Sequence, residues 1–529
     1  MSRKTWTLLA VVLGSSIVFL DSTVVNVALP QMGRELPRSF LGVYEGQSYV
    51  YYGYLLSLSS LLILAGALTD HHGRRRMFMF GLVSFGATSV LCGAAWSLET
   101  LVVFRVLQGV AGAFLVPGSL AIITSSFQGE EQGRAFGVWA AGTAATTILG
   151  PPIGGALVSS FSWRAAFFIN VPLIAIAVWA TLRHVQESKE RLEQGRFDWL
   201  GAAVIALAVG GLTFGPIRGE ATGWSDSTAF ISLAIGGVAA VAFPFLMAKR
   251  RDPLVPLELF KSRNFSVTNI STLVIYGALY VSFQVLALFT IGTLGYNELG
   301  YGLSGLVGPL FLALLSSRFG ALAGRHGPRL YMALGPFLMG LGLLWFVRMP
   351  ATSEAWIADF SDPSTLLPPG DYLVDFLPGV LVFGLGLAVM VAPLTTAVMR
   401  SVPVVHSGLA SAINNAVSRV GPQLIGAVLF IVITSSFYGA ITERVPELNV
   451  ESTSVRQDVT PFNKPEGDHP DEVGDAARSA STEAFHLASL VSALLCIIGA
   501  GVNAVDIRNE DTSAAVEAAE AERVESGTR

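Results

Sequence analysis

Runs of about 20 consecutive apolar residues recur along this 529-residue chain, and they constrain its fold more than any other feature. A helix of that length spans the hydrocarbon core of a bilayer, where every backbone polar group must be satisfied internally. Apolar residues make up 52% of the chain and charged residues 13%, about half of the share usual in soluble proteins. We therefore predict an all-α polytopic membrane protein rather than several soluble domains.

Fourteen such runs can be separated, and each is expected to cross the membrane once. An even number of spans places both termini on one side. Most of the 33 Lys and Arg fall on the side of the N-terminus, so we expect a multi-pass protein of the cell (cytoplasmic) membrane with both termini cytoplasmic. The predicted spans are 5–29, 47–69, 77–95, 100–124, 134–158, 165–182, 199–216, 228–247, 266–291, 303–319, 330–347, 374–399, 407–436 and 484–505.

Two pairs of similar segments indicate an internal repeat. The loop at 66–75 is echoed at 320–329, and the segment 150–156 on the fifth span is echoed at 421–427 on the thirteenth. Two homologous bundles around a midplane site are the architecture of alternating-access carriers. The predicted domains are an N-terminal six-helix bundle (1–182), a two-helix insert with cytoplasmic linkers (183–265), a C-terminal six-helix bundle (266–508) containing an irregular external loop (437–483), and a cytoplasmic tail (509–529).

Five motifs follow one another in the first half of the chain. They are LDSTVVNVALP at 20–30, GALTDHHGRRR at 66–76, RVLQG at 105–109, GPPIGGA at 150–156, and WR at 163–164 with FINVP at 168–172. With these motifs the chain resembles the fourteen-helix drug:proton antiporters of the major facilitator superfamily, the EmrB/QacA type. The second half matches less well, because Gly324 stands where the first repeat has an aspartate and Gln423 interrupts the second glycine–proline motif. The resemblance implies the major facilitator fold, two six-helix bundles plus two extra helices.

The same resemblance implies a proton-coupled secondary active exporter of hydrophobic, often cationic, small molecules. A carrier of another substrate on the same fold, such as a lipid, a cell-wall precursor or a metabolite, stays open. No nucleotide-binding loop, nucleophile elbow or metal-ligand cluster occurs in the sequence, so we expect no enzyme, no cofactor and no metal site. The expected partners are the substrate, protons and membrane lipid. An adaptor protein stays open as a further partner, and nucleic acid is not expected. We expect the protein to function as a monomer.

Asp21 is the only carboxylate in the interior of a predicted span, and an ionised acid there must pair, protonate or line water. At about 1.5 Å per residue, Asp21 lies roughly 13 Å from the outer end of its span and Arg105 roughly 9 Å from the same face. Their depths match within one turn. We therefore predict a proton and cation coupling site at Asp21 and Arg105, with a purely structural ion pair as the alternative.

Two sets of residues are predicted to serve the conformational cycle. In the 66–76 loop, Gly66, Asp70, Gly73 and Arg74 are expected to form a cytoplasmic latch, in which Asp70 accepts hydrogen bonds from a helix N-terminus of the other bundle. The alternative is simple anchoring of the arginines to lipid phosphates. A second set, expected to let helices pack closely and bend, consists of Gly150, Pro151, Gly154 and Gly155.

Polar and aromatic side chains on the first, fourth, ninth and thirteenth spans are predicted to line a substrate cavity. Three of them share one face of the ninth span at i, i+4 and i+8. Aromatic rings with polar tips suit a promiscuous pocket, although such stripes also serve packing. Arg419 offers a partner for an anion or a carbonyl group. The predicted cavity residues are Asn26, Gln108, Tyr276, Tyr280, Gln284, Asn415 and Arg419.

Overall fold

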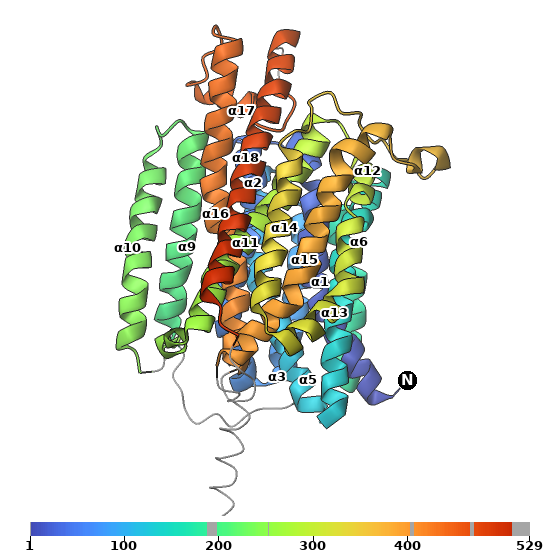
Figure 1. Ribbon diagram of the computed structural model, residues 1–529, viewed down its shortest axis with the longest axis vertical. Coiled ribbons are helices and arrows are strands. Elements are labelled where there is room, and N and C mark those ends of the chain that lie inside the picture. Colours follow the sequence, from blue (N-terminus) through green and yellow to red (C-terminus); the bar gives the residue numbers. More distant parts are fainter. Residues whose placement is uncertain are drawn as a thin grey trace, which may run out of the picture.

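The computed structural model of this protein describes residues 2–127, 129–187, 198–251, 253–402, 407–465 and 470–509. Within these ranges the regular structure is helical, beside one isolated bridge between Asp359 and Asp362. Long helices stand side by side with roughly parallel axes (Figure 1). This is the arrangement expected where each helix must satisfy its own backbone groups in lipid. The prediction of an all-α protein is confirmed.

Three groups of helices follow one another along the chain. Before residue 188 they are α1 (Arg3–Glu35), α2 (Val43–His72), α3 (Arg74–Gly93), α4 (Leu98–Gly112), α5 (Leu115–Ser126), α6 (Gly129–Ser160), α7 (Ala165–Phe168) and α8 (Asn170–His184). Next come α9 (Trp199–Ala221) and α10 (Ser227–Lys249). The third group is α11 (Arg263–Leu288), α12 (Glu298–Ser304), α13 (Val307–His326), α14 (Arg329–Phe346), α15 (Leu377–Arg400), α16 (Ser407–Arg444), α17 (Thr453–Asp458) and α18 (Asp471–Asp506), with the short helices η1 (Leu257–Lys261), η2 (Phe289–Thr293), η3 (Pro363–Leu366) and η4 (Tyr372–Phe376).

Eleven helical stretches in the described part of the chain are long and apolar enough to cross a membrane. They are α1, α3, α4 with α5, α7 with α8, α9, α10, α11 with η2, α14, η4 with α15, α16 and α18. Helices α2, α6 and α13 add 30, 32 and 20 residues of continuous helix. The multi-pass membrane fold is therefore confirmed, and the count of fourteen spans stays a prediction.

The turn between α2 and α3 depends on one glycine. Gly73 has a φ of 110° and is both the C-cap of α2 and the N-cap of α3. Residues with a Cβ rarely adopt this conformation. A Cβ on Gly73 would also lie 2.6 Å from the Glu187 Oε1 atom. The chain can therefore change direction between two long helices over a single residue.

Matching helix pairs in the two halves of the chain pack through glycines. In the first half α6 lies against α1, where a Cβ on Gly150 would meet the Thr23 hydroxyl oxygen at 1.9 Å. In the second half α16 lies against α11, where a Cβ on Gly421 would meet the Leu273 carbonyl oxygen at 2.2 Å. Small residues let helix backbones approach closely in lipid. The equivalent use of glycine in α6 and α16 supports the internal repeat, whose domain limits stay predictions.

Helices α9 and α10 form a pair at one side of the molecule (Figure 1). Helix α9 contacts α2 and α16, one helix from each half of the chain. Arg218 of α9 forms ion pairs with Glu45 of α2 at 3.2 Å and with Asp226, just before α10, at 2.8 Å. The predicted insert is thus attached to the first half by charges as well as by packing.

The segment 437–483, predicted to be an irregular external loop, is helical at both ends. Helix α16 continues to Arg444, α18 begins at Asp471, and α17 forms between them. Arg444 and Glu483 form an ion pair between the two extended helices. The prediction of little regular structure was wrong for these parts, because the polar composition reflects helices that continue past their apolar spans. Most of the predicted tail, residues 510–529, lies outside the described residues.

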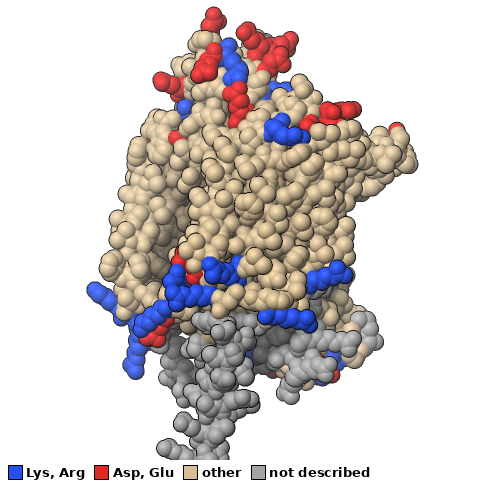
Figure 2. Space-filling model, viewed as in Figure 1, with Lys and Arg blue, Asp and Glu red and all other residues tan. Residues whose placement is uncertain are grey.

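Charged side chains gather at the two ends of the molecule and leave a wide uncharged band between them on the face seen in Figure 2. Lys and Arg predominate toward the end that carries the N-terminus, and Asp and Glu at the opposite end. A band without charges is the surface that the hydrocarbon core of a bilayer requires. Below, these two ends are called the N-terminal end and the acidic end.

Candidate functional site

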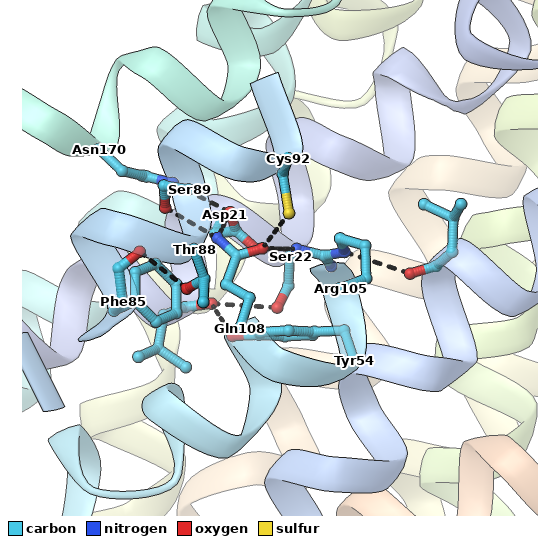
Figure 3. Close-up of polar contacts among 12 residues, drawn as sticks. Asp21, Ser22, Tyr54, Phe85, Thr88, Ser89, Cys92, Arg105, Gln108 and Asn170 are labelled. Carbon is cyan, nitrogen blue, oxygen red and sulfur yellow. Dashed lines mark hydrogen bonds and ion pairs between the residues drawn. The ribbon is translucent and has the colours of Figure 1, made fainter. Parts of the chain in front are cut away.

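A polar cluster lies buried inside the first group of helices (Figure 3). Asp21 comes from α1, Arg105 and Gln108 from α4, Ser89 from α3, and Asn170 from the first turn of α8. All five side chains are fully buried. Four helices therefore contribute polar groups to one point in the bundle, although their sequences are otherwise apolar there.

The Asp21 carboxylate accepts hydrogen bonds from three side chains. Its Oδ2 atom lies 2.5 Å from Arg105 Nη1, and its Oδ1 atom accepts from Gln108 Nε2 at 2.9 Å and from Asn170 Nδ2 at 3.0 Å. A buried carboxylate is costly to ionise unless hydrogen bonds and an opposite charge compensate it. Three donors, one of them a cation, provide that compensation for Asp21.

Arg105 is held by more than its ion pair. Its Nη1 atom also donates to the Gln108 Oε1 atom at 2.7 Å, and its Nε atom donates to the Val50 carbonyl oxygen at 3.2 Å. The guanidinium carbon stands 4.1 Å from the centre of the Tyr54 ring, a cation–π distance. The Arg105 Nη2 atom has no hydrogen-bond partner among the described residues. One N–H donor group of the cluster thus has no acceptor among the described residues.

A central cavity of about 370 Å³ lies between the two halves of the chain. Helices α1, α2 and α6 line it from one half, and helices α11 to α16 with α18 line it from the other. Its wall is mainly apolar and aromatic, and it includes Tyr51, Tyr276, Tyr280 and Tyr301. Small-molecule sites commonly have this volume and an apolar lining with a few polar groups.

Asp21 faces away from this cavity. The face of α1 that lines the cavity carries Phe19, Ser22, Asn26 and their neighbours. Successive helical residues are rotated by about 100°, so Asp21 projects from the opposite side of α1, into the polar cluster. The sequence-based hypothesis that Asp21 directly balances a cationic substrate therefore does not fit this geometry.

Two of the residues predicted to line the cavity lie elsewhere, which corrects the prediction for both. Gln108 belongs to the polar cluster because it lies one turn after Arg105 on the same face of α4. Gln284 is 2% exposed and lies outside the described lining, because eight residues after Tyr276 the face of α11 has rotated by about 80°. The predicted residues found in the cavity wall are Asn26, Tyr276, Tyr280, Asn415 and Arg419.

Several residues of both sites were not predicted from the sequence. Asn170 lies within the 168–172 motif, and its position one residue before a valine–proline pair gave no sign that its amide points at Asp21. Tyr51 and Tyr301 enter the cavity from α2 and α12. The run of tyrosines from Tyr49 to Tyr54 was the available signal for α2, but helical spacing alone does not select which ring faces the cavity.

Contacts that join the two halves gather at the acidic end. Arg34 at the end of α1 pairs with Glu298 of α12 at 3.0 Å, and Arg38 pairs with Asp458 of α17 at 3.6 Å. Nearby, a Cβ on Gly155 of α6 would lie 2.2 Å from the Glu298 carbonyl oxygen, so α6 and α12 approach with no side chain between them. These contacts hold the two halves of the chain together at the acidic end.

The residues predicted as a packing hinge lie together in α6. Gly150 packs on Thr23 of α1 and Gly155 packs on α12, so the segment touches both halves of the chain. Pro151 lies inside the same helix and lines the cavity. Gly154 packs on α1 as well, with its Cβ position 3.1 Å from the Val24 Cα atom. Their role as a hinge stays a proposal.

The residues predicted as a latch lie at the N-terminal end. Arg74, in the first turn of α3, is 7% exposed, and a Cβ on Gly66 would stand 3.5 Å from the Pro117 Cβ atom of α5. Gly73 forms the turn described above. The side chain of Asp70 lies outside the described residues, so the latch stays a proposal.

Comparison with known proteins identifies the family of this chain. Residues 11–427 match the Major Facilitator Superfamily. The chain belongs to this superfamily. It is therefore a membrane transporter rather than an enzyme, as its sequence motifs predict.

Relatives within the superfamily are drug and antibiotic resistance proteins. The chain is 30% identical over 447 residues to multidrug resistance protein Stp of Mycobacterium tuberculosis (strain ATCC 25618 / H37Rv), covering 83% of this chain and 79% of that protein. It is 29% identical over 512 residues to the tetracenomycin C resistance and export protein of Streptomyces glaucescens, covering 94% and 90%. With the methylenomycin A resistance protein of Bacillus subtilis it shares 29% identity over 430 residues, covering 80% and 86%. The resemblance to drug-resistance transporters is confirmed.

Solved structures of other transporters share the fold of this superfamily member. A bacterial homologue of the human lysosomal transporter Spinster, in an inward-facing and unoccupied conformation, aligns with a TM-score of 0.63 at 15% identity, over 96% of this chain and 97% of that one. A peptide transporter of the POT type in complex with sulfate aligns with a TM-score of 0.60 at 15% identity, over 94% of this chain and 95% of that one. At these identities the similarity concerns the fold alone.

Proposed function

We propose that this superfamily member is a proton-driven exporter of hydrophobic small molecules that works by alternating access. In this proposal fourteen helices span the cell membrane, and both termini lie in the cytoplasm. The observation that carries it is the apolar cavity between the two halves, which are joined by an ion pair at the acidic end, beside a buried acid on the other face of α1. The names of the relatives, resistance and export proteins, support export as the direction of transport.

The proposed proton site is the Asp21–Arg105 pair. Protonation of Asp21 removes the charge that holds the Arg105 guanidinium, so the attachment between α1 and α4 weakens. Because α1 also forms part of the cavity wall, a change on its Asp21 face reaches the cavity through the helix itself. Each proton that enters across 100 mV supplies about 2.3 kcal/mol to the cycle.

The proposed cycle alternates between closure at the two ends. In the present state the two halves are held together at the acidic end, so substrate would enter from the cytoplasm at the N-terminal end. Opening at the acidic end requires α6 to separate from α12 and the Arg34–Glu298 pair to part. Half-exposed ion pairs such as this one contribute only about 0–1 kcal/mol each, so they do not lock the gate. The 66–76 turn, with Gly66, Asp70, Gly73 and Arg74, is the proposed latch that holds the N-terminal end closed when the acidic end is open.

Reconstitution tests the proposed function. Purified protein in liposomes with an acidic lumen is offered a panel of hydrophobic dyes and antibiotics, with protein-free liposomes as the control. We expect protein-dependent accumulation of some compounds in the lumen, abolished by a protonophore. Accumulation that persists without the proton gradient would contradict proton coupling, and protein-dependent movement of phospholipid alone would favour the alternative of a lipid carrier.

A further inference from the structure

The charge in the cavity wall is positive. Among the described residues that line the cavity, Arg419 of α16 is the only one with a charged side chain, and the described lining contains no Asp or Glu. Asp21, the acid on α1, points away from the cavity and is already paired with Arg105. A ligand in this cavity therefore meets a cation without a compensating carboxylate in the described wall.

The Arg419 guanidinium is buried but not neutralised within the described part of the chain. The residue is buried, with 8% of its surface accessible. Arg419 takes part in none of the ion pairs formed among described residues, and its contact for the guanidinium is the Phe19 ring, 5.3 Å from the ring centre. A buried guanidinium normally has a carboxylate or phosphate partner, because its desolvation is costly. An arginine that is buried, unpaired and open to a cavity is a site for an anion.

A second polar position lies farther along the same cavity. Asn26 of α1 and Ser282 of α11 both line it, and the buried Asn26 Oδ1 and Ser282 Oγ atoms have no hydrogen-bond partner among the described residues. Phe19, which stands beside Arg419, precedes Asn26 by seven residues on α1, or about 10 Å along the helix axis. Between Phe19 and Asn26, α1 contributes Ser22 and Thr23 to the wall, and most lining residues from the other helices are apolar or aromatic.

We propose that the substrates of this transporter are hydrophobic compounds with an acidic group, which Arg419 binds, and that Asn26 and Ser282 bind a polar group about 10 Å away. This inference rests on the proposed function and gives it a substrate class. It differs from the often cationic substrates that the family resemblance implies, because Asp21, the acid expected to balance such a cation, faces away from the cavity. A cationic compound of the same shape would bring a second positive charge beside Arg419 in a water-poor site, where like charges repel strongly.

Three probes that differ only in charge test this inference. They are 4-(2-naphthyl)butyrate, 4-(2-naphthyl)butanol and 4-(2-naphthyl)butylammonium, each titrated calorimetrically into purified wild-type protein in detergent, with protein-free micelles as the blank. We expect the carboxylate to bind at least tenfold more tightly than the alcohol, and the ammonium to bind most weakly. Equal affinities, or tighter binding of the ammonium, would overturn the proposal.

Variants separate the charge of Arg419 from its bulk. Arg419→Gln should abolish the tenfold preference for the carboxylate, and Arg419→Lys should retain much of it. Asn415 lies one turn before Arg419 in the cavity wall. In Asn415→Asp the new carboxylate should pair with Arg419, so the preference for the carboxylate probe should disappear although the arginine is still present. Arg348→Gln is the matched control, since Arg348 is exposed at the acidic end of α14 beside Trp345. Loss of the preference in this control, or its survival in well-folded Arg419→Gln, would contradict the inference.

Binding and transport distinguish the failure of this inference from that of the proposed function. Gradient-driven accumulation of the alcohol or ammonium in liposomes, with no preference for the carboxylate, would support the proposed exporter function and contradict the proposed substrate class. Tight, Arg419-dependent binding of the carboxylate without any gradient-driven accumulation would support the proposed binding site and contradict proton-driven export.

Discussion

The Asp21 carboxylate and the Arg419 guanidinium lie on opposite sides of helix α1. Asp21 points into the first bundle and pairs with Arg105, whereas Arg419 stands over Phe19, on the cavity face of the same helix. The proposed proton site and the proposed substrate site therefore share a helix but no side chain. Coupling between them has to pass through movement of α1 rather than through competition for one carboxylate.

We predict that Asp21→Asn abolishes gradient-driven accumulation while binding of the naphthyl probes stays within about threefold of wild type. The asparagine cannot exchange a proton, and it lies outside the cavity wall. Liposome uptake and calorimetry on the same preparation check both parts. Weakened probe binding with intact gradient-driven uptake would reverse the assignment and make Asp21 a substrate residue.

A second prediction concerns the stability of the buried pair. Asp21→Ala and Arg105→Ala should each destabilise the protein by about 3–5 kcal/mol, because each leaves an uncompensated buried charge. The double variant should be destabilised by less than the sum of the two. Unfolding of the four proteins in detergent, analysed as a double-mutant cycle, measures this coupling. Additive losses would mean that the two charges do not interact in the folded state.

A third prediction concerns closure at the acidic end. Gly155→Ala places a methyl group about 2 Å from the Glu298 carbonyl oxygen, which is too close for α6 and α12 to remain in contact. The variant should shift the population toward opening at this end. Gly237→Ala is the control, since a Cβ there has no neighbour within 4 Å. Distances between spin labels at positions 40 and 360, both exposed in wild type, should lengthen in the first variant only.

Orientation in the membrane is the subject of a fourth prediction. Glu447→Cys, at the acidic end, should react with a membrane-impermeant maleimide on intact cells. Arg251→Cys, after α10 at the N-terminal end, should react only after the membrane is opened. Both native cysteines are buried, which keeps the background low. Reaction of both introduced cysteines on intact cells would contradict the proposed topology.

The proposed substrate class leads to a fifth prediction, about voltage. If one proton enters for each carboxylate exported, two positive charges move inward per cycle, which is worth about 4.6 kcal/mol per 100 mV. Export of the carboxylate probe should therefore respond to a potassium-diffusion potential imposed without a pH gradient, and more steeply than export of the alcohol. The same voltage response for both probes would show that the carboxylate moves without its charge.

The presence and order of long apolar helices could be predicted from the sequence, because hydrophobic length is a local property, whereas the count of fourteen spans stays a prediction. The partnership of Asp21 with Arg105 was predictable as well, since depth along a straight helix follows from residue count. The side of α1 that Asp21 occupies was not predictable, because it depends on which neighbour each face meets. Gln108 bonds to Asp21 and therefore lies in the polar cluster rather than in the cavity wall. Because Asp21 is also absent from that wall, the charge expected of the substrate changes as well.

Helix continuation past the membrane was the other point that the sequence did not reveal. The 437–483 segment contains four prolines and many charges, which is typical of an irregular loop. Three of them, Pro461, Pro465 and Pro470, lie between α17 and α18, and Pro446 follows the end of α16 at Arg444. The charged stretches that contain no proline remain helical. Composition averaged over the whole segment concealed this division.

The length of α16 and α18 has a practical consequence for imaging. Their 38 and 36 residues correspond to about 57 and 54 Å, against a hydrocarbon core of about 30 Å. The surplus forms a paired projection at the acidic end, tied by Arg444 and Glu483 (Figure 1). Small transporters buried in a detergent micelle offer few features for aligning particles in electron cryomicroscopy. This helical pair provides a landmark outside the micelle, and an antibody fragment selected against it would fix the view without touching the cavity.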